Sequence, residues 1–138
     1  MKSKAPLTLM EQLVMLLVFA LASALCLQMF VLTGNMSRRL EKQDRAVTLV
    51  HNAAETVKIC GGDAEEYAKL LGGEEQGGVV TVGYDADWKP VSAADAESLI
   101  TVEKTSAGLL GTAEIEAAEA DGDVIFSVTA SWQEVADE

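Results

Sequence analysis

The side chains that could do chemistry in this chain are few and stand apart from one another. The single histidine, His51, follows Val50 in a stretch with helical spacing, where a structural role is favoured over that of a catalytic base. No nucleophile elbow, phosphate-binding glycine loop or zinc-ligand spacing occurs in the sequence. The sequence therefore predicts no catalytic residue and no cofactor, and we expect a protein that is not an enzyme.

Two carboxylate pairs come nearest to a calcium-binding loop, Asp85 with Asp87 and Asp121 with Asp123. Neither pair continues with further oxygen ligands and a distant glutamate at the spacing of such a loop. Aspartate is also common in turns, because its side chain hydrogen-bonds the local backbone. We therefore expect no metal site.

The two cysteines, Cys26 and Cys60, are far apart if one helix carries both. At about 1.5 Å per residue their separation is about 50 Å, which no disulfide can bridge. Cys60 is then either free or bonded to another chain, and a free thiol is favoured.

Charge is divided unevenly along the 138 residues, whose net charge is -12. Residues 1–58 hold seven basic and four acidic side chains, whereas residues 59–138 hold three basic and eighteen acidic ones, a net charge of -15. So acidic a segment repels phosphate backbones, and we expect no nucleic-acid partner. It is typical of a solvated surface that keeps copies of a protein apart.

The elements that position these groups begin with an apolar stretch. Residues 12–37 carry no charge, and the twenty residues from Leu13 to Leu32 are long enough to span the roughly 30 Å core of a bilayer. A cleaved secretory signal is the main alternative, with a small-residue site at 22–24. Length argues against it, because the apolar region of a signal is usually about 7 to 15 residues long. A transmembrane helix is therefore predicted. Its short basic N-terminal tail is expected in the cytoplasm and the long C-terminal part outside.

The residues before this stretch form a motif. Residues 6–11 read Pro-Leu-Thr-Leu-Met-Glu and run directly into the apolar segment. This resembles the N-terminal methylation motif of type IV prepilins and type II secretion pseudopilins, in which Gly usually stands where Pro6 stands here. The resemblance implies cleavage between Pro6 and Leu7 by a prepilin peptidase. It also implies N-methylation of Leu7 and pairing of the new amine with Glu11 of a neighbouring subunit. An uncut chain would remain a single-pass membrane protein of pilin-like shape.

Two environments are open for Glu11. A carboxylate within hydrocarbon is costly and usually functional, and there Glu11 would set the register between packed helices of a filament. At the membrane interface, two residues before Leu13, it would instead stay hydrated near the lipid headgroups.

A second helical stretch, to about Ile59, follows the apolar one. Gly34 and Asn35 either interrupt the helix, with Ser37 capping a new one, or only bend it. An uninterrupted helix over residues 7–58 would be about 78 Å long. Its expected apolar stripe consists of Leu40, Val47, Val50, Ala54 and Val57.

The remaining residues predict a small sheet. Glycines 61 and 62 should end the helix, and Asp63 should cap a short helix reaching about Leu71. Glycines 72, 73, 77 and 78 mark a loop, and strands are expected at 79–84, 98–103, 109–117 and 124–132. Asp121-Gly122 signals a hairpin between the last two strands.

These observations predict an α+β fold, in which a long transmembrane and then amphipathic N-terminal helix packs on a small antiparallel sheet. The expected parts are a basic leader (1–6), a transmembrane helix (7–33), an amphipathic continuation (34–60) and an acidic extracytoplasmic domain with three or four strands (61–138).

The resemblance implies a minor pilin-like or pseudopilin-like structural subunit of a type IV pilus or type II secretion-type filament. It would lie in the cell membrane or in a surface filament. Its partners would be the lipid bilayer, other pilin-like subunits through the N-terminal helix, and the prepilin peptidase. The alternative is a single-pass membrane protein that does not polymerise and presents a small extracytoplasmic binding domain.

Overall fold

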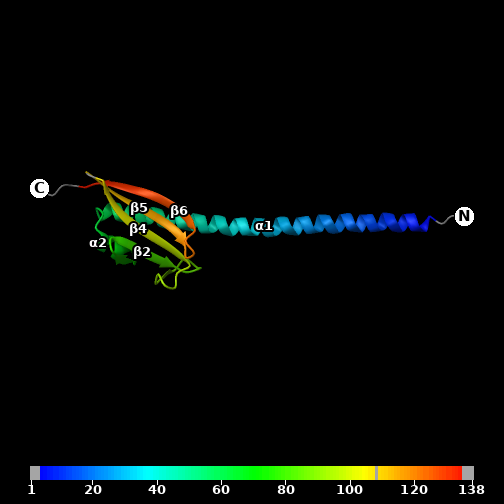
Figure 1. Cartoon of the computed structure of the whole chain (residues 1–138), viewed down its shortest axis with the longest axis horizontal. Helices are drawn as coiled ribbons and strands as arrows, with labels where there is room; N and C mark the ends of the chain where they lie inside the picture. The colour runs from blue at the N-terminus through cyan, green and yellow to red at the C-terminus, as the bar shows by residue number, and fades with distance from the viewer. Residues whose placement is uncertain (1–3, 108, 135–138) are drawn as a thin grey trace. The chain divides into compact units, whose positions relative to one another are not determined.

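One long helix begins the fold (Figure 1). The computed structural model describes residues 4–107 and 109–134, and helix α1 spans Ala5–Ile59, 55 residues, without a break at Gly34 or Asn35. A glycine inside a helix costs about 1 kcal/mol relative to alanine, which is small beside the cooperative hydrogen bonding on both sides of it. The uninterrupted helix is thus confirmed, and a new helix capped by Ser37 is wrong.

The end of α1 and the start of the next helix follow the expected signals. Gly61 and Gly62 both have positive φ, 58° and 82°, and the Gly62 N–H donates to the Val57 carbonyl at 3.0 Å. This closes the last turn in the left-handed conformation that glycine adopts most readily. The Asp63 carboxylate then accepts hydrogen bonds from the N–H groups of Glu65 and Glu66, and α2 spans Ala64–Leu71.

All strand pairs in the sheet are antiparallel. The described residues form six strands: β1 (Glu74–Gln76), β2 (Val79–Tyr84), β3 (Pro90–Val91), β4 (Ser98–Ala107), β5 (Leu110–Glu119) and β6 (Val124–Gln133). Their order is β1-β2-β4-β5-β6, and β3 also pairs with β2 (Figure 1). The four expected strands are confirmed.

The expected total of three or four strands is corrected, because β1 and β3 were not predicted. β1 lies in the segment expected to be a loop, between the glycine pairs 72–73 and 77–78. β3 has only two residues and contains a proline. Neither strand is long enough to show the alternation of apolar and polar residues by which a strand is recognised.

The chain divides into two compact units, residues 1–41 and residues 42–138. The second unit holds a hydrophobic core between the last turns of α1, helix α2 and one face of the sheet. The α1 residues buried in it are Ala46, Val50, Ala53, Ala54 and Val57. The predicted stripe is therefore correct at Val50, Ala54 and Val57. It is wrong at Leu40, which is 58% exposed, and Val47 is only partly buried.

The β5–β6 hairpin forms at the predicted turn. Gly122 has a φ of 97°, and the Glu119 N–H donates to the Asp123 carbonyl at 2.9 Å. The pairing is regular from Gln133 back to Phe126, and then shifts by one residue opposite Ala117 and Ala118. The sequence of β6 alternates with period two, which predicts one buried face formed by Val124, Phe126, Val128, Ala130 and Trp132. The last four of these residues take the core side, whereas Val124 is 56% exposed, so the prediction is wrong at Val124.

Candidate functional site

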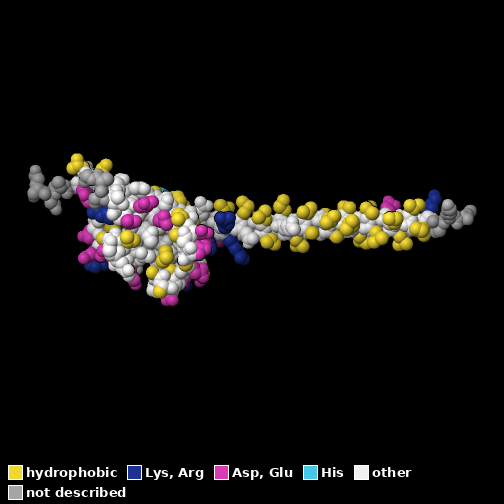
Figure 2. Space-filling model, in the orientation of Figure 1, with side chains coloured by type: hydrophobic (Ala, Val, Ile, Leu, Met, Phe, Trp, Pro, Cys, Tyr) yellow, Lys and Arg dark blue, Asp and Glu magenta, His cyan; other side chains and the backbone are white. Residues whose placement is uncertain are grey.

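The first unit presents an apolar helical surface on every side. Within residues 5–41 no described side chain is buried, and Leu7, Phe19 and Phe30 are 71%, 72% and 82% exposed. Figure 2 shows hydrophobic side chains along most of this segment, whereas most Asp and Glu side chains gather over the second unit. Such exposure in water is unfavourable by about 25 cal/mol per Å² of apolar surface. By length and composition this is the one candidate membrane span among the described residues.

The motif residues lie at the start of this surface. Pro6 is in the first turn of α1, where its missing N–H is not needed and its fixed φ suits the helix. The backbone N–H and the hydroxyl of Thr8 both donate to the Lys4 carbonyl, each at 3.2 Å. The Pro6–Leu7 peptide bond is therefore enclosed by a hydrogen-bonded helical turn, a feature that the motif alone did not predict.

Glu11 is an exposed carboxylate on the same helix. No ion pair or hydrogen bond joins it to any residue in the part of the chain that the structure describes. Leu7 and Met15 stand one helical turn to either side of it, at the i−4 and i+4 positions. Glu11 thus lies within an apolar surface, and the described part of its own chain offers it no compensating charge.

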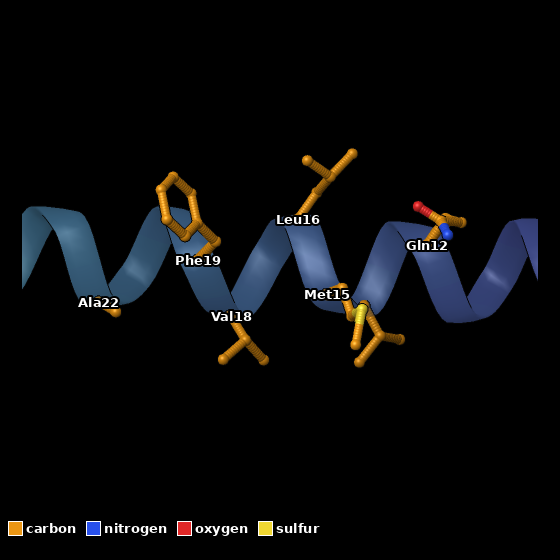
Figure 3. Close-up of a pocket in the computed structure, with 7 residues that line it drawn as sticks. Gln12, Met15, Leu16, Val18, Phe19 and Ala22 are labelled. Carbon is orange, nitrogen blue, oxygen red and sulfur yellow. The ribbon is translucent and has the colours of Figure 1, made fainter.

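A shallow hollow follows Glu11 along the helix (Figure 3). In this view Leu16 and Phe19 project from one side of α1, and Met15 and Val18 from the other. Gln12 contributes the single polar side chain to the lining. The hollow is a gap between side chains of one lone helix, and its chemistry suits an acyl chain or the side chain of another apolar helix.

The other residues singled out by the sequence have local structural roles. His51 is exposed and its ring lies 6.3 Å from that of Phe126. The Asp85 carboxylate accepts from the N–H groups of Asp87 and Lys89, both at 2.9 Å, and the Asp121 carboxylate accepts from the Asp123 N–H at 3.1 Å. These aspartates stabilise turns, and no group of three potential metal ligands occurs among the described side chains.

Both cysteine thiols are free. Cys26 is exposed within the apolar segment, and Cys60 is partly buried just after α1. Burial raises the pKa of the Cys60 thiol, and the carboxylates of Glu66 and Asp63 raise it further. Because the thiolate is the reactive form, Cys60 is a poor nucleophile at neutral pH.

One feature of the second unit was not singled out from the sequence: β6 forms one edge of the sheet. Its ten residues contain no charge, proline or glycine. That run of residues is the sequence signal by which an unprotected edge strand could have been found.

The fold thus defines an α+β protein with one long N-terminal apolar helix and a small antiparallel sheet. In comparisons with known proteins the chain matches no family model, no curated protein and no solved structure.

Proposed function

We propose that the chain is a pilin-like or pseudopilin-like structural subunit, a minor component of a type IV pilus or a type II secretion-type filament. The proposal rests on the surface of the first unit. This unit is an exposed apolar helix that bears the carboxylate of Glu11 next to a prepilin-like sequence at Pro6 and Leu7. The antiparallel sheet that follows in the chain is compatible with such a subunit.

In this function the apolar segment of α1 first lies in the bilayer. Leu13 to Leu32 are all helical, and twenty helical residues extend about 30 Å, the thickness of the hydrocarbon core. The N-terminus faces the cytoplasm, and the acidic second unit lies on the extracytoplasmic side. In a filament the same apolar surface packs against the helices of neighbouring subunits.

Glu11 supplies specificity to that packing. Helices surrounded by hydrocarbon gain little association free energy from apolar side chains alone, because lipid is equally apolar. A carboxylate buried there is costly unless a group of another helix pairs with it. The described part of its own chain offers none. Cleavage after Pro6 would create a positively charged amine at Leu7, which pairs with Glu11 of an adjacent subunit and fixes the register of the two helices.

Cleavage has a structural requirement. Because the Thr8 N–H bonds to the Lys4 carbonyl across the Pro6–Leu7 bond, the first turn of α1 must open before a peptidase can reach that bond. Opening a terminal turn is inexpensive, since helix ends fray readily.

The second candidate is a single-pass membrane protein that does not polymerise and presents its sheet to a partner. Pro6 is the observation that favours it. Proline replaces the usual glycine, and it sits within the helix, where the rigid ring supports the turn that protects the Pro6–Leu7 bond.

Photo-cross-linking from the apolar helix tests the assembly. A photoreactive amino acid replaces exposed Leu17 in the full chain, which is expressed in its host, and adducts in the membrane and filament fractions are identified by mass spectrometry. The filament subunit should form adducts with pilin-like chains, and Glu11→Gln should reduce their yield at least tenfold. Glu41→Gln is the matched control, because it removes an exposed carboxylate from the same helix outside the apolar segment and should change the yield less than twofold.

Two results would argue against the filament subunit. Adducts with lipid alone from Leu17 would indicate a helix that has no helical partner. Equal yields for the two glutamine variants would show that Glu11 does not determine the register.

A further inference from the structure

Strand β6 has an unpaired edge. It pairs with β5 on one side and is the last strand in the sheet order. Along its other side, no backbone or side-chain hydrogen bond to β6 occurs among residues 4–107 and 109–134. Figure 1 shows β6 at the border of the sheet, with no further strand beside it. A row of N–H and C=O groups is therefore available to another chain.

The two edges of the sheet differ in their protection. At the far edge, β1 has only three residues, two of which are Glu74 and Glu75, and β3 has two residues beginning with Pro90. Short strands, charges and proline are the features that prevent pairing between edges. β6 has none of these over ten residues, and its one irregularity is the shift of pairing near its start.

The core layer is also incompletely covered at this edge. On β5 the inward residues Ala113, Ile115 and Ala117 are at most 1% exposed. On β6, by contrast, Phe126 and Val128 lie on the same face and are only partly buried. An additional strand would place its own inward side chains beside these two and complete the apolar layer.

Charge indicates the kind of strand that fits. The outer face of β6 presents the uncharged side chains Ser127, Thr129 and Ser131, and behind it β5 presents Glu114 and Glu116. A strand added to β6 would lie about 10 Å from β5, within roughly one Debye length of those carboxylates. The whole of residues 59–138 carries a net charge of -15. This charge attracts a cationic strand and repels a second copy of the same unit.

We infer that β6 is a docking strand for a cationic extended segment of a partner protein, which joins the sheet by strand addition. The segment alternates Lys or Arg, which face the Glu114 and Glu116 side, with apolar residues that cover Phe126 and Val128. Backbone hydrogen bonds supply affinity, and the alternation supplies selectivity. This interaction does not depend on filament assembly and holds equally for a chain that remains a single-pass membrane protein.

A tethered strand tests the inference on the full chain. A ten-residue peptide that alternates lysine and valine is fused after Glu138 through a flexible glycine-serine linker. The linker gives the peptide a millimolar effective concentration, at which a weak strand interaction becomes visible. Amide hydrogen exchange is measured in non-ionic detergent micelles. We expect exchange of the exposed β6 residues Ser127, Thr129 and Ser131 to slow at least tenfold relative to the chain without the peptide.

Three variants make the test specific. A fused peptide with glutamate at the lysine positions should give less than twofold protection. Thr129→Lys adds a charge to the exposed edge and should abolish protection by the lysine peptide. Gln76→Lys adds the same charge to an exposed residue of β1, at the other edge, and should leave protection within twofold of that of the unmodified sheet.

Three outcomes would overturn the inference. The first is unchanged exchange in β6 with the lysine peptide attached. The second is equal protection by the glutamate peptide, which would remove the role of charge. The third is protection of β6 in the unfused chain that rises with protein concentration, because the edge would then pair with a second copy.

Discussion

At the end of α1 two neighbouring glycines share a left-handed backbone and differ in their surroundings. A Cβ on Gly61, at φ 58°, would meet nothing within 4 Å, whereas a Cβ on Gly62, at φ 82°, would lie 2.2 Å from the Trp132 ring. A Cβ on Gly111 would lie 2.3 Å from the same ring. The indole is therefore held between two glycines and has little freedom to move away.

This difference makes a pair of substitutions informative. Gly61→Ala should cost about 1 to 2 kcal/mol, the penalty for a left-handed alanine. Gly62→Ala should cost about 1 to 3 kcal/mol more, because the Trp132 side chain must be displaced. Urea unfolding of the full chain in non-ionic detergent, followed by tryptophan fluorescence, measures both values. Equal losses for the two variants would contradict the packing of Trp132 on Gly62.

Tyr67 provides a second test at the residue scale. Its side chain is completely buried, and its hydroxyl has no hydrogen-bond partner within the described residues. Burial raises the pKa of the phenol above its usual 10.0, and the carboxylates of Glu75 and Asp63 raise it further. Tyr67→Phe removes an unpaired polar group, so the free energy of unfolding at neutral pH should stay within about 1 kcal/mol of the original or increase.

The pH dependence of the same variant follows from the direction of the pKa shift. Because the folded-state pKa lies above the unfolded-state value, stabilisation from the neutral phenol is complete below pH 10.0. It is lost as the pH rises through the folded-state pKa. The unmodified chain should therefore lose more stability than Tyr67→Phe as the pH rises above 10.0 and through the folded-state pKa of Tyr67. Urea unfolding over this pH range measures the free energy of unfolding of both proteins. Equal losses of stability in the two would contradict a raised pKa for Tyr67.

At the scale of elements, the last turns of α1 attach the helix to the sheet through small side chains. Val57 is fully buried, whereas Ile59, two residues later, is 81% exposed. Val57→Ala should lower the free energy of unfolding by about 2 kcal/mol through lost burial and the cavity that remains. Ile59→Ala is the matched control and should change it by less than about 0.5 kcal/mol. Denaturant unfolding distinguishes them, and a larger effect at Ile59 would mean that another face of α1 is buried.

Most elements could be predicted because their signals are local. Asp63 caps α2, the glycines at 61 and 62 end α1, and Asp121-Gly122 turns the last hairpin, each through hydrogen bonds within a few residues. The buried face of α1 was harder to predict. Ala46 and Ala53 are buried while Leu40 is not, because fit against the sheet decides burial there and side-chain hydropathy does not.

The candidate sites were predicted less completely than the fold. The sequence identifies Pro6, Leu7 and Glu11, but the helical turn around the Pro6–Leu7 bond depends on Lys4 and Thr8 as hydrogen-bond partners. The free edge of β6 depends on the order of the strands. That order is set by long-range pairing and cannot be read from any one segment of the sequence.

At the scale of the whole molecule, the two units have opposite solvent requirements. The first is apolar along most of its length, and the second carries an acidic surface around a small core. A chain with both properties is stable where lipid or other apolar helices cover the first unit and water surrounds the second. The proposed subunit satisfies both conditions, first in the membrane and then in a filament.

The most direct measurement of this proposal is the intact mass and N-terminal sequence of the membrane-extracted chain. The protein is isolated from its host with the prepilin peptidase present and, separately, with it deleted. The proposal predicts a start at Leu7, with the added mass of one methyl group, only in the strain that has the peptidase. A chain that keeps residues 1–6 in both strains would contradict the processed subunit and leave an uncut, permanently anchored membrane protein.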